Sequence, residues 1–204
     1  MLPFERYIKG RMSGKRFNHS INVAKAAKWL AYKYGANEDK AVIAGVLHDI
    51  TKEWKTTQHW QFLHKYNIGI SKYEYASKKL YHSITGSCYC KVFLRITDLE
   101  ILNAIRFHTT ARPHMTLLEK VIYIADFISD DRHFEGVQRL RSLASMNLDT
   151  AVFEGLSVTI NELASEGSLI HPNTLNAYNE YVFKAHERTN PSFLKEMFLK
   201  TNKI

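Results

Sequence analysis

The sequence has few of the residues that build disulfide scaffolds, interdomain linkers and membrane spans. It contains two cysteines, four prolines and nine glycines in 204 residues. Cys88 and Cys90 are two residues apart, and the N-terminal stretch MLPFERYIKGRMSGKRF lacks the apolar core of a secretory signal. We therefore expect free thiols in a reducing cytoplasm. No apolar run is long enough for a membrane helix, so no membrane partner is expected.

Acidic residues are in the minority. The 20 Asp and Glu residues are outnumbered by 28 Lys and Arg, which leaves a net charge of +8. Such an excess favours polyanionic partners, among them nucleotides. The basic residues are dispersed and form no block of five, so a nucleic-acid-binding arm is not favoured.

Helical signals recur along the chain, and no segment shows the alternation of hairpin-bounded strands. Asn37 and Asp98 are placed as helix caps, and Ser71 with Glu74 and Thr116 with Glu119 fit capping boxes. Helices are expected over 18–34, from 37 into His48, from 71, from 98, over 117–128, 148–165 and 173–187, and from Asn190-Pro191. The sequence predicts an all-α fold, a single compact bundle of about ten helices.

The C-terminal segment is the least constrained part of the prediction. We place the domain at 1–188 and a helical tail at 189–204. Residues 166–204 carry aromatic and basic side chains at helical spacing, which favours packing back on the core. A homodimer contact or another partner-binding role for this segment stays open.

Several imidazoles and carboxylates stand on or beside apolar helices. The pair His48-Asp49 ends the run KAVIAGVLHDITK, and Asp126 lies within IYIADFI. A carboxylate in such surroundings is costly to bury unless it is paired or bound to a metal. The full set is His19, His48, Asp49, His82, His108 and Asp126.

One histidine of this set, taken alone, is most simply a core side chain bonded to a backbone carbonyl. Taken together, four imidazoles and two carboxylates are the ligands that a site for Fe, Mn, Co or Zn needs. Beyond the Cys-x-Cys pair there is no further thiolate, which argues against a structural zinc site.

The order of these residues resembles that of the HD superfamily of metal-dependent phosphohydrolases. The surrounding segments resemble, in order and spacing, the YqeK family of bacterial symmetrical diadenosine tetraphosphate hydrolases, over about residues 10–165. These segments are RFNHSINVA, AGVLHDITK, LYHSITGS, AIRFHTTARPHM and IYIADFISDDR. The resemblance implies an HD-type helical domain. It also implies a dinucleoside polyphosphate substrate and a nucleoside diphosphate product.

The resemblance further implies a binuclear metal centre. One ion would be held by His19, His48, Asp49 and Asp126. The other would be held by Asp49, His82 and His108, with Asp49 as the bridge. A hydroxide between the two ions would be the nucleophile. Two divalent ions are expected, Fe(II) first, with Mn(II) or Co(II) as alternatives.

Cations beside such a centre would stabilise the charge of the phosphates. Lys52, one turn after His48, and Arg132, after Asp126, are therefore predicted as catalytic residues together with Asp49. The predicted substrate contacts are Arg16, Lys52, Arg106, Thr109, Arg112 and Arg132. His114 and His133 are two candidates for protonating the leaving group. For each of these side chains, the alternative is an ordinary solvated residue.

The chain departs from the family pattern at three places, one of them a pair of residues. Ala111 follows HTT where the family usually has glycine, which makes the backbone there less free. Ser83 likewise replaces a glycine, and Ser129-Asp130 replaces a common Glu-Pro pair. None of these changes removes a predicted metal ligand, so they bear on substrate preference and rate.

The predicted reaction is symmetrical cleavage of diadenosine tetraphosphate to two ADP. Another HD phosphohydrolase, acting on (deoxy)nucleotides or cyclic nucleotides, would use the same ligands and stays an alternative. A non-catalytic module that binds nucleotide or RNA is less favoured, because a full ligand set is hard to explain without chemistry.

Overall fold

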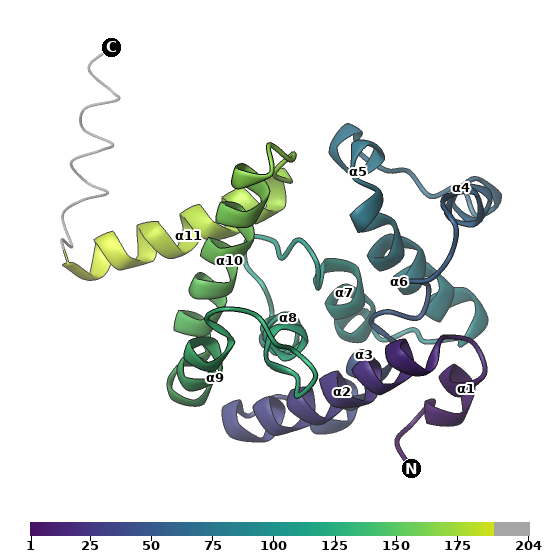
Figure 1. The fold of residues 1–204 in the computed structure, drawn as a ribbon, viewed down its shortest axis with the longest axis horizontal. Helices are drawn as coiled ribbons and strands as arrows, with labels where there is room; N and C mark the ends of the chain where they lie inside the picture. Colours follow the sequence, from purple (N-terminus) through teal and green to yellow (C-terminus); the bar gives the residue numbers. More distant parts are fainter. Residues whose placement is uncertain (190–204) are drawn as a thin grey trace.

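A computed structural model describes residues 1–189, and within them the fold is all-α, as the sequence predicts (Figure 1). The described part contains eleven α-helices and one 3₁₀ helix. They are α1 (Glu5–Lys9), α2 (Gly14–Tyr34), α3 (Glu38–Leu47), α4 (Thr56–Lys65), α5 (Lys72–Ala76), η1 (Lys78–Leu80), α6 (Tyr81–Phe93), α7 (Leu99–Phe107), α8 (Leu117–Ile128), α9 (Val137–Met146), α10 (Leu148–Ser165) and α11 (Pro172–Thr189). None of these helices is long and apolar enough to cross a membrane.

The predicted helix caps are confirmed. Asn37 and Asp98 accept backbone N–H groups at the starts of α3 and α7. The capping boxes that begin at Ser71 and Thr116 are both complete. Helix α2 starts four residues earlier than predicted, because the Ser13 hydroxyl accepts the Arg16 N–H and caps the helix there.

Helix α8 lies in the middle of the bundle, with α2, α3, α7, α9 and α10 around it (Figure 1). Its residues 121–125 are all buried, which explains why IYIADFI is apolar nearly all round. Asp126 follows directly on this buried stretch. The centre of the fold thus carries one of the predicted ligands.

Helices α2 and α3 approach closely at Gly45. A Cβ atom added there would lie 2.7 Å from the Cα of Ala24. Only glycine allows this approach without moving one of the two backbones. The contact brings the end of α3, with His48, against the helix that carries His19.

The described part of the C-terminal segment packs on the domain, as predicted. Helix α11 contacts α10, Ala177 is buried between them, and the rings of Tyr178 and Phe153 stack with centroids 5.2 Å apart. The helix predicted from Asn190-Pro191 lies outside the described residues.

His59 gives the fold a dependence on pH. It is buried on α4, hydrogen bonded through Nδ1 to the Thr85 hydroxyl at 2.9 Å, and burial lowers its pKa to about 4. In the unfolded chain the pKa of His59 is about 6.5. Above pH 6.5 the ring is neutral in both states, so the neutral ring makes its full contribution to the free energy of unfolding. We expect a loss of about 3 kcal/mol between pH 6.5 and 4.

The measurement is the free energy of unfolding against pH for the parent and for His59→Asn, which keeps a polar partner for Thr85 but does not titrate. The difference between the two curves should shrink as the pH falls through this window. His64→Asn, exposed on the same helix, is the control and should follow the parent. Parallel curves for His59→Asn and the parent would contradict the prediction.

Candidate metal centre

The six predicted ligands come together from five helices. His19 lies on α2, His82 on α6 and Asp126 on α8, while His48-Asp49 and His108 directly follow α3 and α7. The ligand atoms of five of them form two groups that share His48, and in each group all atoms lie within 4.8 Å of one another. One group is His19, His48 and Asp126, and the other is His48, Asp49 and His108.

Asp49 lies between two pairs of histidines. Its Oδ1 is 3.2 Å from Nε2 of His82 and 3.7 Å from Nε2 of His108. Its Oδ2 is 3.4 Å from Nε2 of His48 and 3.9 Å from Nε2 of His19. A carboxylate with one oxygen toward each pair of histidines has the placement of a bridging ligand.

Several of these atoms are buried without a hydrogen bond. Nε2 of His19, Nε2 of His48 and Oδ1 of Asp49 have no hydrogen-bond partner among the described residues. Buried polar atoms left in this way are costly, and divalent cations would compensate them. The donor set of imidazole and carboxylate also suits first-row divalent metals, so the residues present fit a metal centre.

The protonation states of three ligands agree with this fit. Burial lowers the pKa of His82 to about 3, and burial lowers the pKa of His48. Burial would raise the pKa of the Asp49 carboxyl, but His48, His108 and His82 together hold that pKa well below its ordinary value. Two neutral imidazoles and an ionised carboxylate are the forms that bind metals.

The outer ring nitrogens hold three of the histidines in place. Nδ1 of His48 is 2.7 Å from the Gly45 carbonyl oxygen, and Nδ1 of His108 is 2.8 Å from that of Ile105. Nδ1 of His19 is 2.8 Å from Oδ2 of Asp131. Donation from Nδ1 leaves the Nε2 lone pair of each ring free to face Asp49.

Asp131 is a side chain at the candidate centre that the sequence analysis missed. Besides His19, it accepts a hydrogen bond from Nδ2 of Asn22 at 3.2 Å. The signal available was a carboxylate five residues after Asp126, in IADFISDDR. The pairing of Asp131 with His19 is visible only once α2 packs beside α8.

We expect Asp131→Asn to weaken metal binding about 10- to 100-fold, because the outer carboxylate orients His19 and raises its basicity. The measurement is a calorimetric titration with Mn(II). Asp130→Asn changes the exposed neighbouring carboxylate and should bind Mn(II) like the parent. Equal affinities for all three proteins would show that Asp131 does not support the site.

Three predicted cations surround the centre. The Arg16 guanidinium contacts Oδ2 of Asp49, and that of Arg132 contacts Oδ1 of Asp126. Nζ of Lys52 is 3.1 Å from Nε2 of His82 and 3.8 Å from Oδ1 of Asp49. The hydroxyl of Thr109 is 3.2 Å from Nε2 of His108.

Other predicted contacts have different partners. Arg106 forms an ion pair with the buried Glu74, and Arg112 forms one with the buried Glu119, at 2.8 Å. His114 is exposed, with Nδ1 3.6 Å from the Glu180 carboxylate, and His133 is exposed as well.

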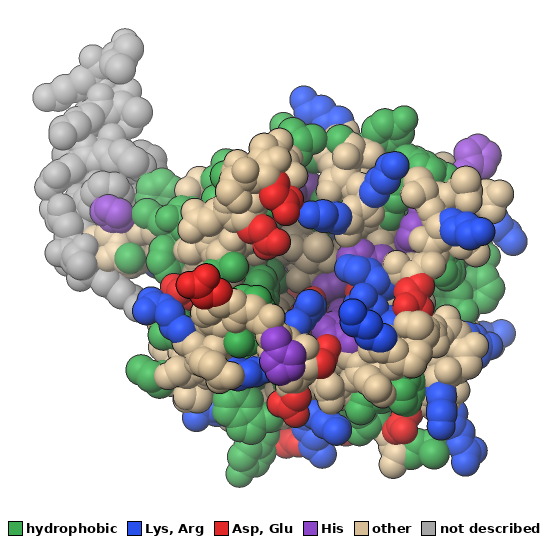
Figure 2. All heavy atoms as spheres, in the orientation of Figure 1, with side chains coloured by type: hydrophobic (Ala, Val, Ile, Leu, Met, Phe, Trp, Pro, Cys, Tyr) green, Lys and Arg blue, Asp and Glu red, His purple; other side chains and the backbone are tan. Residues whose placement is uncertain are grey.

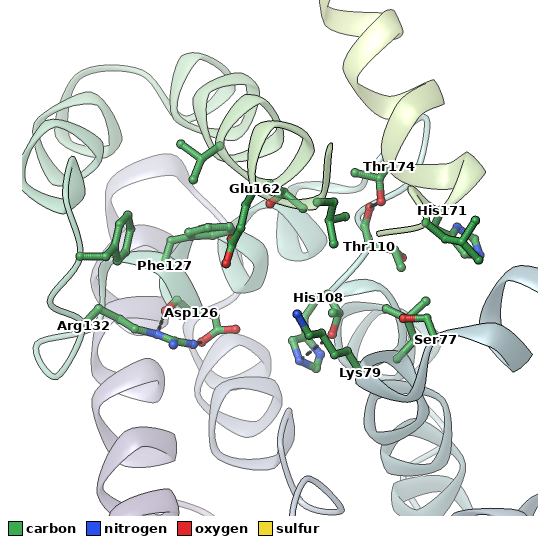
Figure 3. Close-up of a pocket in the computed structure, with 17 residues that line it drawn as sticks. Ser77, Lys79, His108, Thr110, Asp126, Phe127, Arg132, Glu162, His171 and Thr174 are labelled. Carbon is green, nitrogen blue, oxygen red and sulfur yellow. Dashed lines mark hydrogen bonds and ion pairs between the residues drawn. The ribbon is translucent and has the colours of Figure 1, made fainter. Parts of the chain in front are cut away.

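A cavity of about 600 Å³ opens beside the centre. Figure 3 shows Asp126 and Arg132 toward one end, Ser77 and His171 toward the other, and His108 and Lys79 between them. Phe127, Phe134, Val158, Leu163 and Leu169 add apolar walls that the sequence analysis did not foresee. In Figure 2 the hollow shows histidine side chains at its bottom, with lysine and arginine side chains beside it.

An HD domain family model matches residues 16–130, more than half of the chain, and this segment contains all six ligands. The chain belongs to the HD domain family. His48-Asp49, directly after α3, is the one His-Asp pair in the matched segment, and the predicted family is confirmed.

Relatives of this HD domain cover most of its length. The symmetrical bis(5'-nucleosyl)-tetraphosphatase of Halalkalibacterium halodurans is 34% identical over 87% of this chain and 94% of its own. Proteins of the same name from Bacillus subtilis and Staphylococcus aureus are 33% identical, over 84% and 87% of this chain and 92% of each relative. The crystal structure of a predicted HD superfamily hydrolase from Clostridium acetobutylicum superposes with a TM-score of 0.85 at 34% identity. It covers 89% of this chain and 96% of that one.

Proposed function

We propose that this HD domain protein is a metal-dependent hydrolase that cleaves dinucleoside tetraphosphates symmetrically, converting diadenosine tetraphosphate and water to two ADP. The observation that carries the proposal is Asp49, whose two oxygens face four histidines beside a cavity of about 600 Å³ that Lys79 and Arg132 line. The activity named for the three relatives supports the choice of substrate.

The residues present would hold two divalent ions. We assign His19, His48, Asp49 and Asp126 to one ion and Asp49, His82 and His108 to the other. Such ions, when bound, make a nucleophile available from water at neutral pH and neutralise phosphate charge. We propose Fe(II), with Mn(II) and Co(II) as substitutes, in the reducing cytoplasm that the two free thiols favour.

The cations of the chain bind the polyphosphate. Arg16, Lys52 and Arg132 each have a charged group at the centre, where they would contact the phosphate oxygens on both sides of the scissile bond. The hydroxyl of Thr109 lies where it can donate to one of these oxygens. Fixed donors that meet developing charge contribute most when they are already in place.

The apolar part of the cavity binds a nucleoside. Phe127 and Phe134 line it next to Arg132, so a base can lie against the rings while its phosphates reach the cations. A water oxygen then attacks an inner phosphorus. The bond from that phosphorus to the central bridging oxygen breaks, and the bridging oxygen leaves with the second ADP.

The test is product analysis in ¹⁸O-labelled water. The protein is purified without oxygen, supplied with Fe(II) or Mn(II) and given diadenosine tetraphosphate, and the nucleotides are separated by ion exchange. We expect ADP as the sole product, with one ¹⁸O atom in half of the molecules. AMP and ATP together would overturn symmetrical cleavage. Metal binding without any turnover would overturn the function and favour deoxynucleotides, cyclic nucleotides or binding alone.

A further inference from the structure

The loop between α7 and α8, residues 109–116, adopts an unusual backbone conformation close to the metal centre. Ala111 has a φ of 54° and His114 a φ of 56°, both in the left-handed region. This region is unfavourable for residues other than glycine. Strained conformations of this kind persist only where surrounding contacts hold them.

Local contacts hold part of this loop: the Ala111 N–H donates to the Phe107 carbonyl oxygen at 2.8 Å, and Arg112 pairs with Glu119. Two further contacts come from α11. The Thr174 hydroxyl donates to the carbonyl oxygen of Thr110 at 2.8 Å, and both residues are almost fully buried. Figure 3 shows the two side chains side by side above the cavity. Farther along α11, Oε2 of Glu180 accepts the backbone N–H of His114 at 2.6 Å. One contact therefore precedes the left-handed Ala111, and the other lies at the left-handed His114.

The loop begins at the centre itself. Thr109 follows the ligand His108 directly, and its hydroxyl is 3.2 Å from Nε2 of His108 and 3.4 Å from Nε2 of His82. Thr109, Thr110 and Thr174 all line the cavity. The conformation of this loop therefore decides where the Thr109 hydroxyl lies.

We propose that α11 is a clamp on this loop. Thr174 and Glu180 are positioning residues that hold Ala111 and His114 in the left-handed conformation. The clamped loop in turn places the Thr109 hydroxyl against His82 and His108. Helix α11 lies beyond the segment that matches the HD family, 16–130. A glycine at 111 would adopt this conformation without a steric cost, whereas alanine requires an external contact. The catalytic part of the inference rests on the proposed function.

The test compares three variants with the parent. They are Thr174→Val, Thr174→Ser and a double variant that carries both Thr174→Val and Ala111→Gly. Two readouts are taken: hydrogen exchange of the backbone amides in 109–116, and kcat and KM for diadenosine tetraphosphate. We expect Thr174→Val to raise the exchange rate and to lower kcat about tenfold with little change in KM, as loss of an outer-shell contact does. Thr174→Ser keeps the hydroxyl and should behave like the parent.

The double variant separates a clamp from a merely structural contact. If Thr174→Val lowers kcat and exchange protection because Ala111 leaves the left-handed region, glycine at 111 should restore most of both. If Thr174→Val only leaves the Thr110 carbonyl without a donor, stability falls and glycine restores nothing. A double variant in which glycine restores nothing would overturn the clamp. So would Thr174→Val with an unchanged exchange rate, or with a raised KM at constant kcat.

Two further variants complete the design. Glu180→Ala should speed exchange at His114. Leu175→Ala, at an exposed position of α11 that makes none of these hydrogen bonds, should match the parent in both readouts. If the parent hydrolyses no dinucleoside tetraphosphate, the proposed function fails, while the exchange rates still decide whether the clamp exists.

Discussion

Asp49→Ala is expected to hydrolyse diadenosine tetraphosphate at least about 10³-fold more slowly than the parent and to retain no bound metal. Asp49 is almost fully buried, and its two oxygens face four imidazoles. Without it, the centre loses the carboxylate whose two oxygens lie within 3.9 Å of all four histidines. The measurement is metal content after gel filtration together with turnover.

The control for this variant is Asp39→Ala, which removes an exposed carboxylate from α3, the helix that precedes His48-Asp49. It should keep both the metal and the activity of the parent. Circular dichroism should show the same helix content for both variants, so that unfolding is excluded as the cause. Full turnover by Asp49→Ala would rule out the binuclear model.

Gly45→Ala is expected to destabilise the fold by about 2 kcal/mol, although alanine is the better helix former. Replacing a helical glycine by alanine usually gains about 1 kcal/mol. Here the new Cβ would lie 2.7 Å from the Cα of Ala24, and a backbone atom cannot rotate away. The overpacking, which costs about 3 kcal/mol, therefore outweighs the gain in propensity.

Gly86→Ala on α6 is the matched control. Its added Cβ would meet its nearest neighbours, Ile50 and Thr51, at 3.5 Å, which is ordinary contact, so this variant should be as stable as the parent or more so. Gly45→Ala should also bind Mn(II) more weakly, because the Gly45 carbonyl orients His48. Urea unfolding and calorimetry measure the two effects. Equal stability of the two variants would contradict the packing argument.

The sequence predicts best what is encoded locally. Caps such as Asn37 and Asp98 act on the next few residues, so the helices that they start could be predicted from the chain alone. Helix α4 begins at Thr56, after the N-cap position Lys55, which is a poor cap residue, and this helix was not predicted. Helix α9 begins after a left-handed glycine and was missed for the same reason.

For the site, the ligand types could be predicted, but their outer partners could not. His19 and Asp126 stand out because charge or imidazole on an apolar helix is unusual, and their spacing matches a known family. Asp131 and Thr174 lack such a signal, because their roles depend on how α2 and α11 pack. Arg106 and Arg112 show the converse: both lie close to His108 in sequence, yet the fold pairs them with buried glutamates.

The placement of α8 in the middle of the bundle has a consequence for biosynthesis. The ligands extend along the chain from His19 to Asp126, and Asp126 lies on this central helix. A ribosome-bound chain that has not yet reached α8 therefore has imidazoles and Asp49 but cannot complete the centre. The candidate centre is therefore incomplete until α8, the last of the five helices that position its side chains, has been translated.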